Sequence, residues 1–196
     1  CIRDRGWFEG REARFEYEFR PPAELRTQLN PRKAKVVVAQ LERIEKGKRK
    51  GETLDLSVHA IGKVEFEFWL FDRDSAVLKA VTDDLKGLKD YLDENGGIRI
   101  YRDGIRVYDF GEPGNDWLNL DIRRVNIPTA RTSNNQILGA LRLDATASGD
   151  LQEKSNREGF IETPAYAAFR GAVTSVLTNV EAEKTKDQKR LREVLG

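Results

Sequence analysis

The sequence predicts an α+β domain, and three stretches carry that prediction. In residues 96–111, the pair Asp103-Gly104 separates two runs rich in strand-forming residues, which is a strong signal for a β-hairpin. Over 13–20, aromatic residues alternate with charged ones, as expected of a strand with one buried face. Thr163-Pro164 is a typical helix start, and an apolar stripe at helical spacing follows it.

The other elements are predicted from periodicity and from turn residues. Pro31 precedes a run in which Val37, Leu41 and Ile44 fall at helical spacing, so we expect a helix over 32–46. Residues 53–58 and 63–71 are expected to be strands, and one helix is expected from Asp74 or Ser75 to about Asn95. Residues 118–143 are interpreted as a long edge strand or irregular segment, a polar turn at 132–136 and a strand at 137–143.

Composition narrows the possible functions. The 34 basic and 33 acidic residues give a net charge of +1, which favours neither a nucleic-acid role nor a membrane-surface role. No stretch approaches the length of an apolar membrane span, so we expect a cytoplasmic protein. One cysteine and one histidine exclude an internal disulfide and the usual zinc sites, and we expect no metal site. Because the chain has no methionine, we expect it to be a piece of a longer protein.

Standard catalytic motifs are absent, but two polar loops are candidate anion sites. They are 131–136, before the predicted strand 137–143, and 154–159, before the last helix. Amide and guanidinium groups on turns donate several hydrogen bonds to an anion, and phosphate is the expected guest. The alternative is that these are ordinary turns and that Arg157 pairs with Glu158 or Glu162.

Four motifs together resemble a known family. They are Gly96-Gly-Ile-Arg-Ile-Tyr-Arg-Asp-Gly104, Gly111-Glu-Pro-Gly-Asn-Asp-Trp-Leu118, Ser133-Asn-Asn-Gln136 and Ser155-Asn-Arg-Glu-Gly-Phe-Ile161. In this order they resemble the segment that follows the ATP-binding domain in prokaryotic ATPases of the gyrase, heat-shock chaperone, histidine-kinase and mismatch-repair (GHKL) superfamily. That segment, the transducer, is similar to the second domain of ribosomal protein S-five. The resemblance implies a small mixed or antiparallel sheet with helices on one face and a left-handed βαβ crossover.

The resemblance also implies a site. In this family the preceding domain binds Mg²⁺ and ATP, and the transducer extends a basic or amide side chain to the terminal phosphate. Arg157 matches the arginine of the chaperone branch and is the expected catalytic residue. The gyrase and mismatch-repair branches use a lysine on a corresponding loop, where this sequence offers an amide instead. The candidate nucleotide contacts are therefore Gln136, Asn135, Asn134, Asn156 and Lys154.

The resemblance further implies partners and a division of the chain. The partners are the chain's own N-terminal ATP-binding domain and a second copy of the parent protein. Residues 1–162 would form the transducer-like domain, and 163–196 a long helix that packs on it and leads to a downstream region.

Two alternatives remain open at the level of the sequence. A nucleic-acid-binding module could use Lys46–Lys50, Arg123-Arg124 and Lys184–Arg192 as basic patches, although a solvated turn is the preferred interpretation of the first. A dimerisation element could use helix 164–190.

Overall fold

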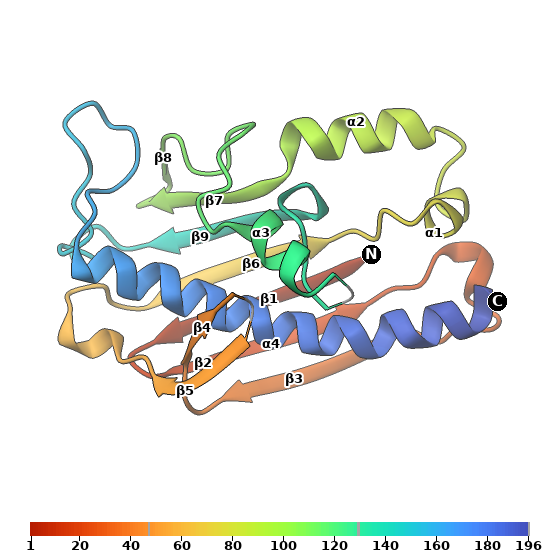
Figure 1. Ribbon diagram of the computed structural model, residues 1–196, viewed down its shortest axis with the longest axis horizontal. Helices are drawn as coiled ribbons and strands as arrows, with labels where there is room; N and C mark the ends of the chain where they lie inside the picture. The colour runs from red at the N-terminus through yellow and green to blue at the C-terminus, as the bar shows by residue number, and fades with distance from the viewer. Residues whose placement is uncertain (47, 129, 196) are drawn as a thin grey trace.

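The computed structural model describes residues 1–46, 48–128 and 130–195, and it has the α+β class that the sequence predicts (Figure 1). The strands are β1 (Ile2–Glu9), β2 (Glu12–Phe19), β3 (Arg32–Val38), β4 (Glu42–Glu45), β5 (Lys48–Thr53), β6 (Val64–Leu70), β7 (Gly97–Arg102), β8 (Ile105–Val107) and β9 (Ile137–Leu143). The α-helices are α1 (Ser75–Lys79), α2 (Leu85–Asn95), α3 (Leu120–Asn126) and α4 (Pro164–Leu195). Short 3-10 helices are formed by Ala23–Leu25, Leu56–Val58 and Asn134–Gln136.

Seven strands form one mixed sheet in the order β3-β2-β1-β6-β9-β7-β8. All neighbouring pairs in it are antiparallel except β7 and β9, which are parallel. β4 and β5 form a separate two-stranded hairpin. The predicted strands at 13–20, 63–71 and 137–143 and the hairpin at 96–111 are confirmed.

The long helix α4 covers one face of the sheet, and α3 lies on the same side (Figure 1). The helix starts as predicted, because the Thr163 Oγ1 accepts a hydrogen bond from the Tyr166 N–H at 3.1 Å. Its apolar stripe packs on aromatic side chains of the sheet, and residues of both are fully or almost fully buried: Phe8, Phe66, Phe68, Phe169, Val173, Val176 and Val180. Apolar burial between α4 and the sheet therefore contributes to the stability of the fold.

The opposite face of the sheet carries mostly charged side chains. Arg3 donates from Nε to Glu67 at 2.8 Å, and its guanidinium lies 4.8 Å from the centre of the Trp69 ring. On β2 the outward positions alternate with the buried aromatic residues, as the period of two requires. The outward face is thus suited to contact with water.

The central strand β1 was not predicted. Its inward positions are Ile2, Asp4, Gly6 and Phe8, so an aspartate and a glycine interrupt the apolar alternation. The strand pairs with β2 on one side and with β6 on the other over nearly its whole length. Residues 2–9 therefore form a strand because they pair with β2 and β6, and not because of an apolar pattern of their own.

The predicted helix over 32–46 is wrong. Residues 32–38 form β3, which pairs with β2, and 42–45 form β4. Val37, which we assigned to the apolar helix face, is 65% exposed. Valine, with its branched Cβ, suits an edge strand at least as well as a helix, and pairing with β2 decides between the two.

Three further predictions are corrected. Residues 53–58 are not a strand, because the Asp55 side chain accepts a hydrogen bond from the Ser57 N–H and begins a 3-10 turn. The single helix expected to Asn95 is divided into α1 and α2, and Asp84 caps the second by accepting from the Gly87 N–H. The segment expected to be an edge strand or irregular contains α3.

Candidate functional site

The loop 154–159 is held in place by its ends. The Lys154 N–H donates to the Gly159 carbonyl at 3.0 Å, and the Gly159 N–H donates to the Tyr108 carbonyl. Glu153 forms an isolated bridge with Phe160, whose ring is buried. The loop is therefore fixed to the core on one side while its tip faces solvent.

Arg157 lies at the tip of this loop. Its backbone N–H donates to the Lys154 carbonyl at 2.8 Å, and its φ of 61° is in the left-handed region. The residue is exposed, and among the described residues its side chain has no hydrogen-bond or ion-pair partner. The pairing with Glu158 or Glu162 that an ordinary turn would imply does not occur, since Glu158 binds Asn156 and Glu162 lies 3.8 Å from Arg170.

Two polar neighbours of Arg157 differ in their roles: Asn156 holds the turn together, whereas Lys154 lines an open cleft. Asn156 closes the turn, because its Oδ1 accepts from the Glu158 N–H at 3.1 Å and its Nδ2 donates to that residue's carboxylate at 2.8 Å. Lys154 lines a polar cleft of about 330 Å³ that also reaches Asp116 and Arg170. Burial raises the pKa of Asp116 above its ordinary value.

The second candidate loop has two of its three amide side chains, those of Gln136 and Asn135, engaged within the chain. Gln136 is buried, and its Oε1 accepts from the Ser133 N–H at 3.1 Å to complete a capping box. The Asn134 N–H donates to Asp121 at 2.9 Å, and the Asn135 Nδ2 donates to Asp93 at 2.7 Å. This turn therefore ties α2 and α3 to the start of β9.

The fold does not bring the two candidate loops together. Asn134–Gln136 leads into β9, whereas 154–159 follows the other end of that strand, and Figure 1 shows them well separated along the sheet. Seven residues of strand span about 20 Å. A single small anion cannot contact both loops in this arrangement.

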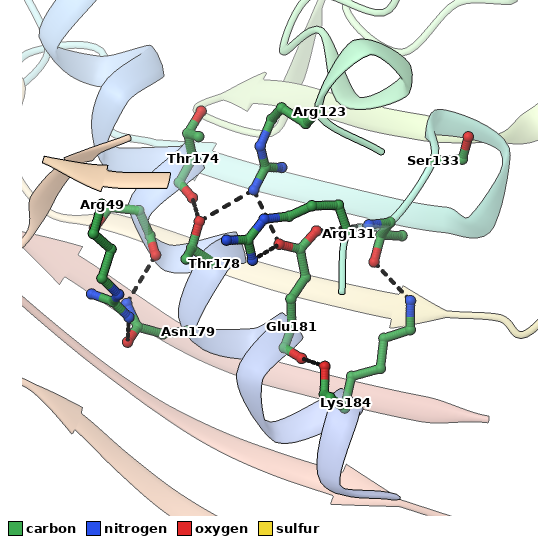
Figure 2. Close-up of polar contacts among 12 residues, drawn as sticks. Arg49, Arg123, Arg131, Ser133, Thr174, Thr178, Asn179, Glu181 and Lys184 are labelled. Atoms are coloured by element: carbon green, nitrogen blue, oxygen red, sulfur yellow. Dashed lines mark hydrogen bonds and ion pairs between the residues drawn. The ribbon is translucent and has the colours of Figure 1, made fainter. Parts of the chain in front are cut away.

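A buried ionic cluster lies behind the second loop, and sequence analysis missed it (Figure 2). Glu181 on α4 is 1% exposed, and one of its oxygens accepts from Arg123 and from Arg131, each at 3.0 Å. The other oxygen accepts from the Thr132 N–H at 2.8 Å, and the buried Lys184 donates to the Thr132 Oγ1 at 3.0 Å. The cluster joins α3 and the chain before β9 to α4.

The basic residues that suggested nucleic-acid binding do not form one open patch. Arg123 and Lys184 are buried in the ionic cluster. In the hairpin, Arg49 pairs with Glu42 at 3.2 Å, and Lys50 lies 3.4 Å from Glu45; residue 47 of this cluster is outside the described residues. The apolar stripe of α4 that suggested a dimerisation helix is buried against this chain's own sheet.

The described residues form neither a metal-binding cluster nor a membrane-spanning helix. Within 1–46, 48–128 and 130–195, no group of three His, Cys, Asp or Glu side chains could hold a metal ion. None of the helices in this part of the chain has both the length and the apolar composition needed to cross a membrane.

The chain matches no family model, no curated protein and no solved structure.

Proposed function

We propose that the chain is the transducer domain of a GHKL-type ATPase. It would couple ATP binding and hydrolysis, carried out by an N-terminal ATP-binding domain, to dimer closure or to a downstream region in a cytoplasmic protein. The basis is the resemblance of four motifs that occur in family order within 96–161. An α+β fold with a mixed sheet is compatible with that assignment.

The finer fold assignment is part of the proposal. A transducer similar to the second domain of ribosomal protein S-five has a βαβ unit with a left-handed crossover. The parallel pair β7 and β9, with α3 in the connection between them, supplies the elements of such a unit. Here α4 also packs on one face of the sheet. We therefore propose that 1–162 form the transducer-like domain and that 163–196 form a long helix that packs on it and leads to a downstream region.

The observation that carries the proposed site is the side chain of Arg157, which lies on a braced turn and has no partner within the described part of the chain. A cation without an internal partner has its hydrogen-bond donors available for a ligand. Because the turn is already fixed at both ends, little conformational entropy is lost when a ligand binds there. Gln136 and Asn135 already bind groups within the chain, so they suit a structural role better than a phosphate contact. Lys154, beside the same turn, is the second candidate.

The proposed chemistry is electrostatic. Mg²⁺ and ATP would be held by the N-terminal domain, and this chain would add the Arg157 guanidinium at the terminal phosphate. A guanidinium so placed stabilises the charge of the phosphoryl-transfer transition state, and an arginine in this role contributes about 10³-fold or more to the rate.

ATP turnover of the full-length parent tests the proposal. We expect this chain alone to show no turnover, and the parent to lose most of its turnover on Arg157→Ala, with a smaller loss on Lys154→Ala. Arg26→Ala is the matched control, because Arg26 is also an exposed arginine outside regular structure. Normal turnover by the Arg157 variant would refute the assignment of this residue.

A further inference from the structure

The second half of α4, residues 181–195, has little apolar contact with the rest of the molecule. Among its described residues, Leu191 is the one buried apolar side chain, and Val194 is partly buried. Its other buried positions carry charged side chains. Undocking this half would expose little apolar area, so its docking depends on the state of its charges.

Arg32 on β3 is the centre of the contact between this half and the sheet. It donates from Nη1 to the Glu183 carboxylate at 2.7 Å and from Nε to the Asp187 carboxylate at 2.8 Å. The buried Asp187 also accepts from the Tyr17 hydroxyl of β2 at 2.7 Å. Two carboxylates of the helix therefore share one guanidinium of the sheet.

Asp4 adds a third carboxyl group to this contact. It lies beside Tyr17 of β2 and Phe68 of β6 on the inward face of β1, and it is fully buried. Among the described residues neither of its oxygens has a hydrogen-bond partner. The nearby charges that act on it are those of Glu183 and Arg32, and Arg32 is already bound to the helix. An ionised Asp4 would therefore be a buried carboxylate that faces another carboxylate, which is costly.

Two further cations of this contact belong to the helix itself. Lys186 donates to Glu183 at 2.6 Å, and Arg190 donates to Asp187 at 2.6 Å. Because they lie on α4, they neutralise its carboxylates whether or not this half is docked. They therefore do not oppose its release.

We propose that the second half of α4 is a pH-sensitive arm, which is docked on the sheet while Asp4 is protonated and is released when Asp4 gives its proton to solvent. Release would let water reach the carboxylate and would leave Arg32 of the sheet as its counter-charge. This behaviour does not depend on any role in ATP hydrolysis.

The direction of the pH effect separates Asp4 from the other titratable groups of this contact. Burial raises the pKa of Asp4, so docking is complete below about pH 4 and weakens as pH rises through the folded pKa. Burial opposes the shift at Glu183 and Asp187, but hydrogen bonds outweigh it and lower the pKa of each. Burial lowers the pKa of Lys184. These three groups would weaken docking as pH falls, which is the opposite sign.

Hydrogen exchange of the whole chain, followed by mass spectrometry between about pH 5 and about pH 8, tests the release. A short helix without tertiary contacts is only marginally stable, so a released arm loses amide protection. Residues 164–180 are the internal reference, since apolar contacts hold them to the sheet. We expect the protection factors of 183–195, relative to this reference, to fall by up to about tenfold per pH unit until Asp4 is ionised.

Asp4→Asn and Asp4→Val cannot ionise, and in each the ratio should be independent of pH. Two substitutions are used so that poor folding of one does not end the test. Glu16→Gln is the matched control, because Glu16 is an exposed carboxylate of β2, and it should keep the dependence of the parent chain. A ratio that does not change with pH in the parent chain would overturn the proposal. So would the parent's dependence in the Asp4 variants, or an equal loss of protection in 164–180 and 183–195.

Discussion

Asp4 is the residue whose environment is least expected from its chemistry. It lies on the inward face of the interior strand β1 and is fully buried, and among the described residues neither of its carboxyl oxygens has a hydrogen-bond partner. Burial raises the pKa of Asp4 well above its ordinary value, the negative charge of Glu183 raises it further, and Arg32 opposes the shift. The folded chain therefore favours the neutral carboxyl.

The raised pKa of Asp4 makes the stability of the folded chain depend on pH. The pKa of Asp4 is higher in the folded chain than in the unfolded chain, so its favourable contribution is complete below about pH 4 and is lost as pH rises through the folded pKa. Asp4→Asn cannot ionise. We expect it to raise the free energy of unfolding near neutral pH by on the order of 1 kcal/mol or more, with the gain shrinking towards about pH 4.

Urea unfolding near neutral pH and at about pH 4 measures the difference in the free energy of unfolding between Asp4→Asn and the parent chain. Glu16→Gln is the control, because Glu16 is an exposed carboxylate on the outward face of β2. A difference between Asp4→Asn and the parent chain that is the same at both pH values would refute the explanation.

At the scale of elements, the second half of α4 buries charged residues in place of apolar ones. After Val180 the buried positions are Glu181, Lys184 and Asp187, and then Leu191. Asp187 accepts from the Tyr17 hydroxyl at 2.7 Å and from the Arg32 Nε at 2.8 Å, which ties the helix to β2 and β3. Ionic clusters therefore dock this half of α4, and apolar contacts dock the first half.

Glu181→Gln should destabilise the chain strongly. The substitution keeps the shape but removes the negative charge that faces the buried Arg123 and the largely buried Arg131, so both lose an ion-pair partner. Loss of one partner of a buried ion pair costs about 3 kcal/mol. Urea unfolding at neutral pH should show this loss.

Glu193→Gln is the matched control on the same helix, since Glu193 is exposed and should change stability by no more than about 0.5 kcal/mol. Equal stability of the two variants would mean that the cluster contributes no net stabilisation.

At the scale of the whole molecule, one helix covers most of an apolar sheet face. The aromatic side chains of β1, β2 and β6 belong to one buried cluster with the apolar stripe of α4, and the opposite sheet face is polar. Loss of the helix would expose a contiguous apolar surface, which a sheet in water does not tolerate.

Truncation tests this dependence. A chain of residues 1–162 should lose cooperative urea unfolding and should aggregate, as followed by circular dichroism and light scattering. A chain ending after residue 191 keeps the buried part of α4 and should unfold cooperatively. Cooperative unfolding of the 1–162 chain would instead show that the sheet is stable without its helix.

The sequence by itself determined the elements whose signals are local. The turn at Asp103-Gly104, the strands at 13–20 and 137–143 and the cap at Thr163 depend on residues close together in the chain, and the structure confirms them. The sequence also predicted the two polar loops, but not that they lie apart or that, as far as the structure describes the chain, only 154–159 presents an unpaired cation.

Tertiary structure decided the rest, because those choices depend on partners distant in the chain. Residues 32–38 form a strand because they pair with the free edge of β2. Residues 2–9 form a strand despite the inward Asp4 because β2 and β6 pair with them on both sides. One sequence signal for the ionic cluster existed: Lys184 and Asp187 continue the spacing of the apolar stripe. Spacing alone could not distinguish buried charges from solvated ones, since the partners that stabilise this burial, which are arginines of α3 and β3 and the Tyr17 hydroxyl of β2, lie far away in the chain.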